Sequence, residues 1–256
     1  MPLVATWNVN SIVARKDRAL AWLEKAGPDI VCLQELKCQD PKFPFEELKE
    51  LGYEAATHGQ KTYNGVAILA KAPIEVRSRG FEDGVDDPQA RFLCAQTMGL
   101  TIMSAYCPNG GTVDSDKYQY KMDWYQRLRN YLDQQLKSSD PLILAGDFNV
   151  APEDIDCHDP KAWEGSVLFT DKEKAALTKI KEFGFSDIYR RLNPEEKAFS
   201  WWDYRSLGFQ LNKGMRIDFI LATDSLTAKA RKSWIDRDER KGTKPSDHAP
   251  VLVEFG

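Results

Sequence analysis

The sequence predicts an α/β fold in which helices cover the faces of β-sheets. Short apolar runs rich in β-branched residues alternate with amphipathic stretches along the whole chain, as is typical of layered α/β proteins. No Gly/Ser-rich linker, repeat or low-complexity tract interrupts the 256 residues, so we expect a single domain, residues 1–256. With 42% hydrophobic residues, a chain of this length buries a sizeable core without disulfides or structural metals.

The N-terminal part predicts two buried strands with a helix between them. Leu3–Trp7 is an apolar run of strand length. Arg15–Ala26 carries apolar residues at helical spacing, and Gly27 followed by proline ends that helix. Ile30–Leu33 is the second strand, and a short helix is expected at Phe45–Leu51.

The rest of the chain predicts many strands around two longer helices. Asp116–Lys137 places apolar residues along one side of a long helix. A polar loop at Ala151–Glu164 precedes a further helix at Asp171–Phe183. β-Branched and aromatic content predicts the remaining strands, which are Val66–Ala70, Ile74–Arg79, Phe92–Thr97, Leu100–Tyr106, Leu142–Ala145, Phe199–Trp202, Arg216–Leu221, Ser233–Asp236 and Val251–Phe255.

Charge and cysteine content narrow the function classes. The 35 basic and 39 acidic residues give a net charge of −4, so any surface that binds a polyanion must be local. No apolar run approaches the ~18 residues of a membrane span, and the N-terminus lacks a signal-peptide pattern. We therefore expect a cytoplasmic protein without a membrane partner. The five cysteines form no C-x-x-C pair, which favours buried free thiols over a zinc site.

Polar side chains gather at the ends of the predicted strands, where a rigid sheet presents groups to a ligand. They are acids, amides, one tyrosine and one histidine: Asn8, Asn10, Glu35, Tyr106, Asn109, Asp147, Asn149, Asp218, Asp247 and His248. Carboxylate and amide oxygens suit Mg²⁺ or Mn²⁺. Taken singly, each has an ordinary explanation: Glu35 as a solvated loop residue, Gly146–Asn149 as a turn, and Trp201 as core.

Several motifs follow one another along the chain. They are T-W-N-V-N at Thr6–Asn10, P-D-I-V-C-L-Q-E-L-K at Pro28–Lys37, Y-C-P-N-G at Tyr106–Gly110, G-D-F-N-V-A-P at Gly146–Pro152, F-S-W-W-D-Y-R at Phe199–Arg205, N-K-G-M-R-I-D at Asn212–Asp218 and S-D-H-A-P-V at Ser246–Val251. Together they resemble the exonuclease III family of apurinic/apyrimidinic (AP) endonucleases. Q-E-L-K and S-D-H are shared with the wider endonuclease/exonuclease/phosphatase superfamily, whereas W-W-D-Y-R and N-K-G-M-R-I-D point to its DNA-repair branch.

The resemblance implies a four-layered α/β sandwich, in which two β-sheets are flanked by helices as in DNase I. It implies hydrolysis, dependent on Mg²⁺ or Mn²⁺, of the DNA phosphodiester 5′ to an abasic site. This base excision repair reaction leaves a 3′-hydroxyl, and the implied side activities are 3′-phosphodiesterase, 3′-phosphatase and 3′–5′ exonuclease. The expected partner is double-stranded DNA with abasic sites or blocked 3′ ends, and we expect a monomer.

The motif positions also imply residue roles. The metal ligands would be Glu35, helped by Asn10 and Asp247 directly or through water. Asp147 would deprotonate the attacking water. The assisting residues would be Asn149 and Asn8 beside Asp147, Asp218 paired with His248 at the scissile phosphate, and Tyr106 as a phenol or a phenolate.

Substrate recognition is expected from an apolar pocket, because an extrahelical abasic sugar lacks a base. The matching positions are Trp201, Met215 and Ile217, with Trp202 packed beneath. Asn109 would add a hydrogen bond, Lys37 and the Lys229–Lys244 stretch are candidates for a basic rim, and Asn10 stands where some relatives have Asp.

Two other classes stay open at this point. A different enzyme of the superfamily, such as a phosphoinositide phosphatase or sphingomyelinase, would share Glu35, Asp147 and His248 without needing Trp201 or Met215. A non-catalytic DNA-binding module would have lost some of these side chains, yet all are present. The balance between abasic incision and 3′-end processing depends on loop shape, which a single sequence does not define.

Overall fold

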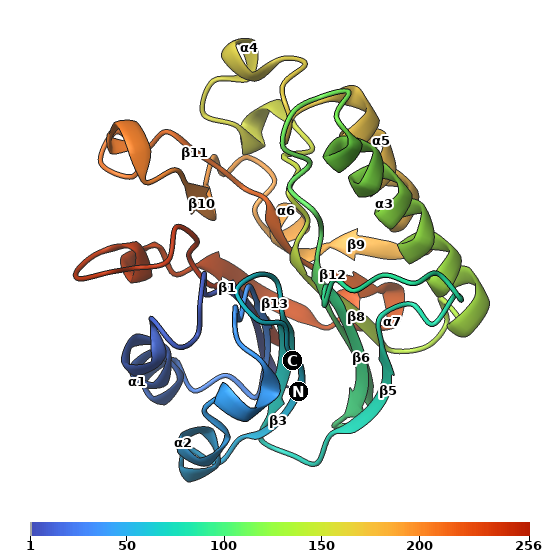
Figure 1. Cartoon of the computed structure of the whole chain (residues 1–256), viewed down its shortest axis with the longest axis vertical. Coiled ribbons are helices and arrows are strands. Elements are labelled where there is room, and N and C mark those ends of the chain that lie inside the picture. Colours follow the sequence, from blue (N-terminus) through green and yellow to red (C-terminus); the bar gives the residue numbers. More distant parts are fainter. Residues whose placement is uncertain (1) are drawn as a thin grey trace.

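The computed structural model describes residues 2–256 and contains two six-stranded mixed sheets packed face to face (Figure 1). The strands of the first sheet, in spatial order, are β13 (Ala230–Ile235), β14 (Val251–Phe255), β1 (Leu3–Asn8), β2 (Ile30–Gln34), β4 (Val66–Ala70) and β3 (Glu54–His58). Those of the second are β5 (Glu75–Arg79), β6 (Phe92–Thr97), β7 (Leu100–Tyr106), β8 (Leu142–Asp147), β12 (Asp218–Thr223) and β9 (Phe185–Asp187). A short hairpin pairs β10 (Trp201–Trp202) with β11 (Gly214–Met215).

The longer helices lie on the outer face of each sheet. The α-helices are α1 (Lys16–Ala26), α2 (Phe45–Glu50), α3 (Asp116–Gln135), α4 (Pro160–Trp163), α5 (Asp171–Lys181), α6 (Ile188–Leu192) and α7 (Asp224–Thr227). Short 3₁₀ turns occur at Asp40–Lys42, Asp154–Asp156, Arg205–Leu207 and Arg237–Arg240. In Figure 1, α1 and α2 stand on one side of the paired sheets, and α3 and α5 stand on the other.

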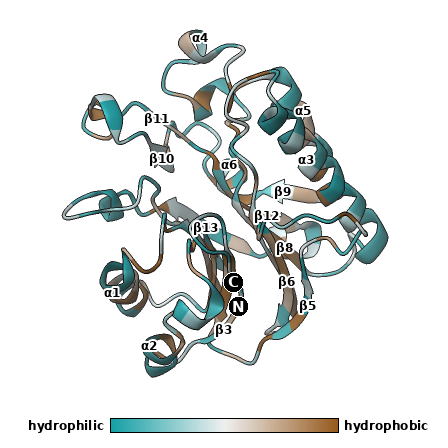
Figure 2. Ribbon diagram, viewed as in Figure 1, coloured by the Kyte–Doolittle hydropathy of each residue, from teal (hydrophilic) through white to brown (hydrophobic). Residues whose placement is uncertain are grey.

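Three apolar clusters join these layers. The cluster between the sheets contains Ile68 from the first sheet and Ile143 from the second, both without exposed surface. A second cluster packs Trp22 of α1 against the first sheet, and a third packs Trp124 and Leu128 of α3 against the second. Figure 2 shows the apolar strands inside and the hydrophilic helix faces outside. The four-layered α/β sandwich predicted from the sequence is therefore confirmed.

Parallel pairing brings functional strand ends to one edge. β1 runs parallel to β2, with Asn8 opposite Gln34, and β7 runs parallel to β8, with Tyr106 opposite Asp147. The β7–β8 approach requires a glycine, because a Cβ on Gly146 would lie 1.9 Å from the carbonyl oxygen of Ala105. The glycine of G-D-F-N thus places the next residue, Asp147, at the edge of the sheet.

Some elements differ from the sequence prediction. The edge strand β3 was not predicted, because its sequence E-A-A-T-H is poor in β-branched residues. The short elements β9, α6 and α7 were missed for lack of length, and α4 lies inside the expected loop Ala151–Glu164. The strand expected at Arg216–Leu221 is displaced, since β12 begins at Asp218.

The thiols agree with the sequence prediction. All five cysteines are buried and free. Within residues 2–256, no helix combines the length and the apolar character that crossing a membrane demands.

Candidate active site

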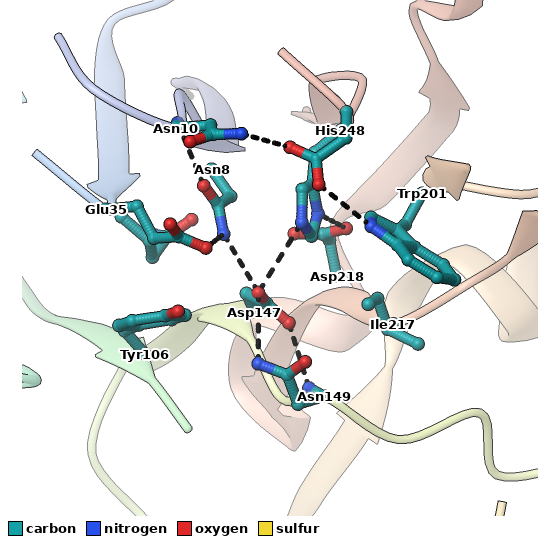
Figure 3. Close-up of polar contacts among 12 residues, drawn as sticks. Asn8, Asn10, Glu35, Tyr106, Asp147, Asn149, Trp201, Ile217, Asp218 and His248 are labelled. Carbon is teal, nitrogen blue, oxygen red and sulfur yellow. Dashed lines mark hydrogen bonds and ion pairs between the residues drawn. The ribbon is translucent and has the colours of Figure 1, made fainter. Parts of the chain in front are cut away.

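Side chains from both sheets meet at one edge of the sandwich (Figure 3). The first sheet supplies Asn8 from the end of β1 and Glu35 just after β2. The second sheet supplies the ends of β7 and β8 and the start of β12. Of the residues predicted from sequence, those that converge here are Asn8, Asn10, Glu35, Lys37, Tyr106, Asn109, Asp147, Asn149, Trp201, Ile217, Asp218, Asp247 and His248.

Asp147 lies at the centre and is 1% exposed. Its Oδ1 accepts the backbone N–H of Asn149 at 2.9 Å, and its Oδ2 accepts the Asn8 Nδ2 amide at 2.9 Å. The side-chain amide of Asn149 donates to the same Oδ2 at 3.3 Å. Asn8 Nδ2 also donates to Glu35 Oε1 at 2.8 Å, so one amide group joins the two carboxylates. Two asparagines therefore fix the orientation of Asp147 (Figure 3).

His248 lies between two buried carboxylates, Asp218 and Asp147, and Ser200 bonds to the first of them. Its Nδ1 contacts Asp218 Oδ2 at 2.9 Å, and its Nε2 lies 3.7 Å from Asp147 Oδ2. Ser200 Oγ donates to the same Asp218 oxygen at 2.6 Å while accepting the backbone N–H groups of Ile217 and Asp218. This contact places the Nδ1 proton toward Asp218 and leaves Nε2 facing Asp147.

The buried acids make His248 cationic. Burial opposes the charge, but Asp218 and Asp147 outweigh it, and the pKa of His248 is raised. Burial raises the pKa of Asp147, and Asp218 adds to this rise while His248 opposes it. An acid with a raised pKa beside an imidazolium is suited to accept a proton from a water molecule at neutral pH.

Glu35 carries a negative charge in a different setting. Burial opposes its ionisation, but the ammonium of Lys37, 2.8 Å from Glu35 Oε2, outweighs this and lowers the pKa of Glu35. Ring or carboxylate atoms of Glu35, Asp147 and His248 all lie within 4.8 Å of one another, but both nitrogens of an imidazolium are donors, so the two carboxylates are the available ligands. The donor set is rich in hard oxygens and contains no thiol, which fits a divalent cation such as Mg²⁺ or Mn²⁺. The sequence had grouped Asn10 and Asp247 with Glu35 instead; these two lie beside the cluster and contact each other.

The surroundings of Tyr106 favour its neutral phenol form. Its pKa is raised well above the ordinary value by burial and by Glu35, against the opposing charge of Arg91. The Arg91 guanidinium stacks on the Tyr106 ring at 4.6 Å, and its Nη1 donates to the Tyr106 carbonyl at 3.3 Å. Of the two states left open by the sequence, the hydroxyl donor is the one this environment favours.

Two loops of the site are held by an ion pair that the sequence prediction missed. The Lys121 ammonium of α3 donates to the backbone carbonyl of Asn109 at 3.1 Å and to that of Asn149 at 2.6 Å. It also pairs with Glu173 of α5, and neither side chain is exposed. Asn109 Nδ2 in turn donates to Asn149 Oδ1 at 3.2 Å. The T-D-K-E pattern beginning at Thr170, a capping box, was the visible signal for this part of α5.

The residues predicted to form an apolar pocket lie in the β10–β11 hairpin and just after it. Trp201 pairs with Met215, and its ring is partly exposed, whereas Met215 and Ile217 are 0% and 1% exposed and pack beneath it. Trp202 is fully buried, as predicted, and packs against Phe199 and Phe209. The exposed apolar surface beside His248 is therefore that of Trp201, not Met215.

Two basic residues of the candidate rim make contacts within the protein and so are not free to bind DNA. Arg240 is buried, stacks near Trp202, Tyr204 and Phe209, and donates to the Ser246 carbonyl at 2.5 Å. Arg240 therefore holds two loops together and does not face solvent. Lys37 is tied to Glu35 inside the site.

Four site residues adopt the left-handed backbone conformation, which non-glycine residues rarely do. The φ angles are 45° at Asn10, 52° at Glu35, 53° at Lys37 and 50° at Asn149. Glu35 and Lys37 have no side-chain preference that favours it. Strained backbone at these positions is typical of functional sites.

Known proteins resemble this chain in sequence and in fold. The profile of the Endonuclease/Exonuclease/phosphatase family matches residues 5–248. An exodeoxyribonuclease III of Haemophilus influenzae is 37% identical, with 98% of each chain covered. Solved structures include an AP endonuclease from Archaeoglobus fulgidus (37% identity, TM-score 0.96, covering 100% of this chain and 99% of that one). Another is a 3′ phosphatase, NExo, from Neisseria bound to a product DNA hairpin (36% identity, TM-score 0.94, 100% of both chains).

These relatives are DNA-processing nucleases and a DNA 3′ phosphatase, and they match over the full length. The chain therefore belongs to the exonuclease III family of AP endonucleases within the endonuclease/exonuclease/phosphatase superfamily, and it is a phosphodiesterase of the exonuclease III type.

Proposed function

We propose that this protein is an AP endonuclease that hydrolyses the phosphodiester 5′ to an abasic site in double-stranded DNA and leaves a 3′-hydroxyl. The observation that carries the proposal is the position of the partly exposed Trp201, which forms an isolated antiparallel β-bridge with His248. An apolar surface next to phosphate-binding groups suits a sugar that lacks its base.

The residues of the central cluster would divide the reaction among them. Asp147, fixed by Asn8 and Asn149, accepts the proton of the attacking water. The His248 imidazolium and the Tyr106 hydroxyl donate hydrogen bonds to the phosphate oxygens, where charge grows as the new P–O bond forms and the 3′-oxygen leaves. Asp218 keeps His248 cationic throughout.

A divalent cation, Mg²⁺ or Mn²⁺, would be held by Glu35 with Asp147 at its side, and when bound it supplies charge neutralisation at the phosphate and at the leaving oxygen. Asn10 and Asp247 would take part at most through water. The buried free thiols are consistent with the reducing cytoplasm as the place of action.

A second activity, removal of 3′-phosphate and other 3′ blocks, is favoured by one comparison. NExo, which is 36% identical over the full length, is described as a 3′ phosphatase. Both activities would use the same phosphate-binding residues. They differ in whether the DNA continues beyond the sugar in the pocket.

The test uses a duplex with one tetrahydrofuran abasic analogue and a labelled 5′ end, with Mg²⁺ in one reaction and EDTA in another. We expect Mg²⁺-dependent incision 5′ to the analogue with a 3′-hydroxyl product. A matched duplex with a 3′-phosphate at a nick measures the second activity. Removal of the 3′-phosphate without incision at the analogue would refute the AP endonuclease proposal and leave a 3′-end-processing enzyme.

A further inference from the structure

A continuous polar chain runs from the acidic cluster to the pocket tryptophan. The Lys37 ammonium, 2.8 Å from Glu35 Oε2, donates to Asn10 Oδ1 at 2.6 Å. Asn10 Nδ2 donates to Asp247 Oδ1 at 2.8 Å, and the indole N–H of Trp201 donates to Asp247 Oδ2 at 3.1 Å. Figure 3 shows Asn10 and Trp201, the two residues that this chain joins.

The chain depends on an amide at position 10. The Asn10 side chain accepts with its oxygen and donates with its nitrogen, so it links a cation to an anion. A carboxylate at the same position would accept from Lys37 but would repel Asp247. Asn10 and Trp201 each donate to one oxygen of Asp247, and Asp247 is not among Glu35, Asp147 and His248, the three residues whose ligand atoms lie within 4.8 Å of one another.

The backbone restricts the same pair of residues. Trp202 N donates to the Asp247 carbonyl at 3.0 Å, and Ala249 N donates to the Ser200 carbonyl at 2.7 Å, with Trp201 bridged to His248. The indole ring of Trp201 rotates about its own side-chain bonds, however, and only the bond to Asp247 fixes its N–H edge. The charge-assisted bond thus selects one orientation of the ring, which packs against the buried Met215 and Ile217.

We propose that Asp247 and Asn10 are specificity-positioning residues, which fix the Trp201 indole and thereby set the discrimination between a sugar without a base and an intact nucleotide. This inference rests on the proposed AP endonuclease function for its selectivity readout. It assigns Asp247 to the pocket and not to the cation, and it gives the amide of Asn10 a task that an acid could not perform.

The first arm of the test needs neither DNA nor metal. The protein is labelled with 5-fluorotryptophan, and the Trp201 resonance among the seven tryptophans is identified by its loss in Trp201→Phe. We expect Asp247→Asn and Asn10→Asp to shift or broaden this ¹⁹F resonance. The control Asp238→Asn changes an exposed acid that pairs only with Lys241, and it should leave the resonance in place.

The second arm compares selectivity with cation binding. Selectivity is the ratio of incision at the abasic analogue to incision of intact duplex, and we expect it to fall about 10-fold or more in both variants. In the Trp201→Phe background, Asp247→Asn should have no further effect, because Phe has no indole N–H. Mn²⁺ titrated calorimetrically without DNA should bind Asp247→Asn as it binds the unchanged protein, and Asn10→Asp more tightly.

Opposite results identify the rival role. If Asp247→Asn weakens Mn²⁺ binding and leaves both the Trp201 resonance and the selectivity unchanged, Asp247 is a cation ligand and the proposal is overturned. If Asn10→Asp improves both Mn²⁺ affinity and selectivity, the amide has no positioning role, which also overturns it. A protein that never prefers the abasic duplex fails the proposed function, while the ¹⁹F arm still decides whether Asp247 anchors Trp201.

Discussion

Replacing Lys121 with methionine removes an ammonium that three acceptors share. Methionine has a similar length and fits the buried space, so the change deletes charge and hydrogen bonds more than volume. It leaves the Glu173 carboxylate buried without its cation, and it leaves the carbonyls of Asn109 and Asn149 without their side-chain donor.

The magnitude follows from this geometry. Unpairing one member of a buried ion pair destabilises a protein by about 3–5 kcal/mol, and neither Lys121 nor Glu173 is exposed to soften that cost. For a domain of this size the loss corresponds to a fall in Tm of about 6–20 °C. The loops that carry Asn109 and Asn149 lose their anchor, so incision should fall about 100-fold even well below the new Tm.

Urea unfolding measured by circular dichroism tests the predicted loss of stability. Incision measured at a temperature about 20–25 °C below the Tm of the variant tests the predicted loss of activity. In the double variant Lys121→Met/Glu173→Gln the unpaired charge is gone. The backbone N–H groups of Leu168 and Thr170 donate to different Glu173 oxygens, so the single amide oxygen of glutamine keeps an acceptor for one of them. The double variant should therefore be more stable than Lys121→Met alone but equally slow. Lys172→Met, an exposed lysine of α5, is the control. A Lys121→Met protein within about 1 kcal/mol of the parent would show that the pair contributes little.

Three further outcomes are expected. Asp147→Asn should keep duplex affinity within a few-fold but reduce incision by about 10²–10⁴ or more, since the water loses its base; equal turnover would remove Asp147 from that role. Asp218→Asn should lower the pKa of His248, measured by NMR of the imidazole, and should reduce incision without loss of fold. An unchanged pKa of His248 would show that Asp218 does not control the charge of His248. Burial raises the pKa of the Cys32 and Cys107 thiols to about 12 from an ordinary value of 9.0, so unfolding is favoured as the pH rises above 9 while stability below 9 is unaffected. The loss should be roughly 1 kcal/mol per thiol at pH 10, measured by urea unfolding at pH 8 and pH 10, and the Cys32→Ala/Cys107→Ala protein should lose less.

Most of the fold was predictable because its signals are local. Long strands such as β4 and β7 are continuous apolar runs, and α3 has an apolar stripe over its whole length. β3 and β9 were not predictable, since an edge strand of small residues and a three-residue strand are defined by their neighbours in the sheet and not by their own composition.

The candidate site was predictable as a set of residues but not as an arrangement. Glu35, Asp147 and His248 lie in motifs, and strand ends bring them together. Ser200 stands in one of those motifs, but its bond to Asp218 depends on the hairpin returning to β12. Lys121 was not predictable, because its sequence context is that of any lysine on a helix. The loops that pack around it cause its burial, and the local sequence does not indicate this.

The left-handed backbone at Glu35, Lys37, Asn10 and Asn149 has a consequence for how this protein tolerates change. Glycine at Glu35 or Lys37 would relieve about 1 kcal/mol of strain at each position and delete the chemistry in the same step. A gain in stability at these two positions would therefore come at the expense of activity. Met98, in the turn between β6 and β7, has the same conformation outside the site, so glycine at position 98 should stabilise the protein without loss of activity.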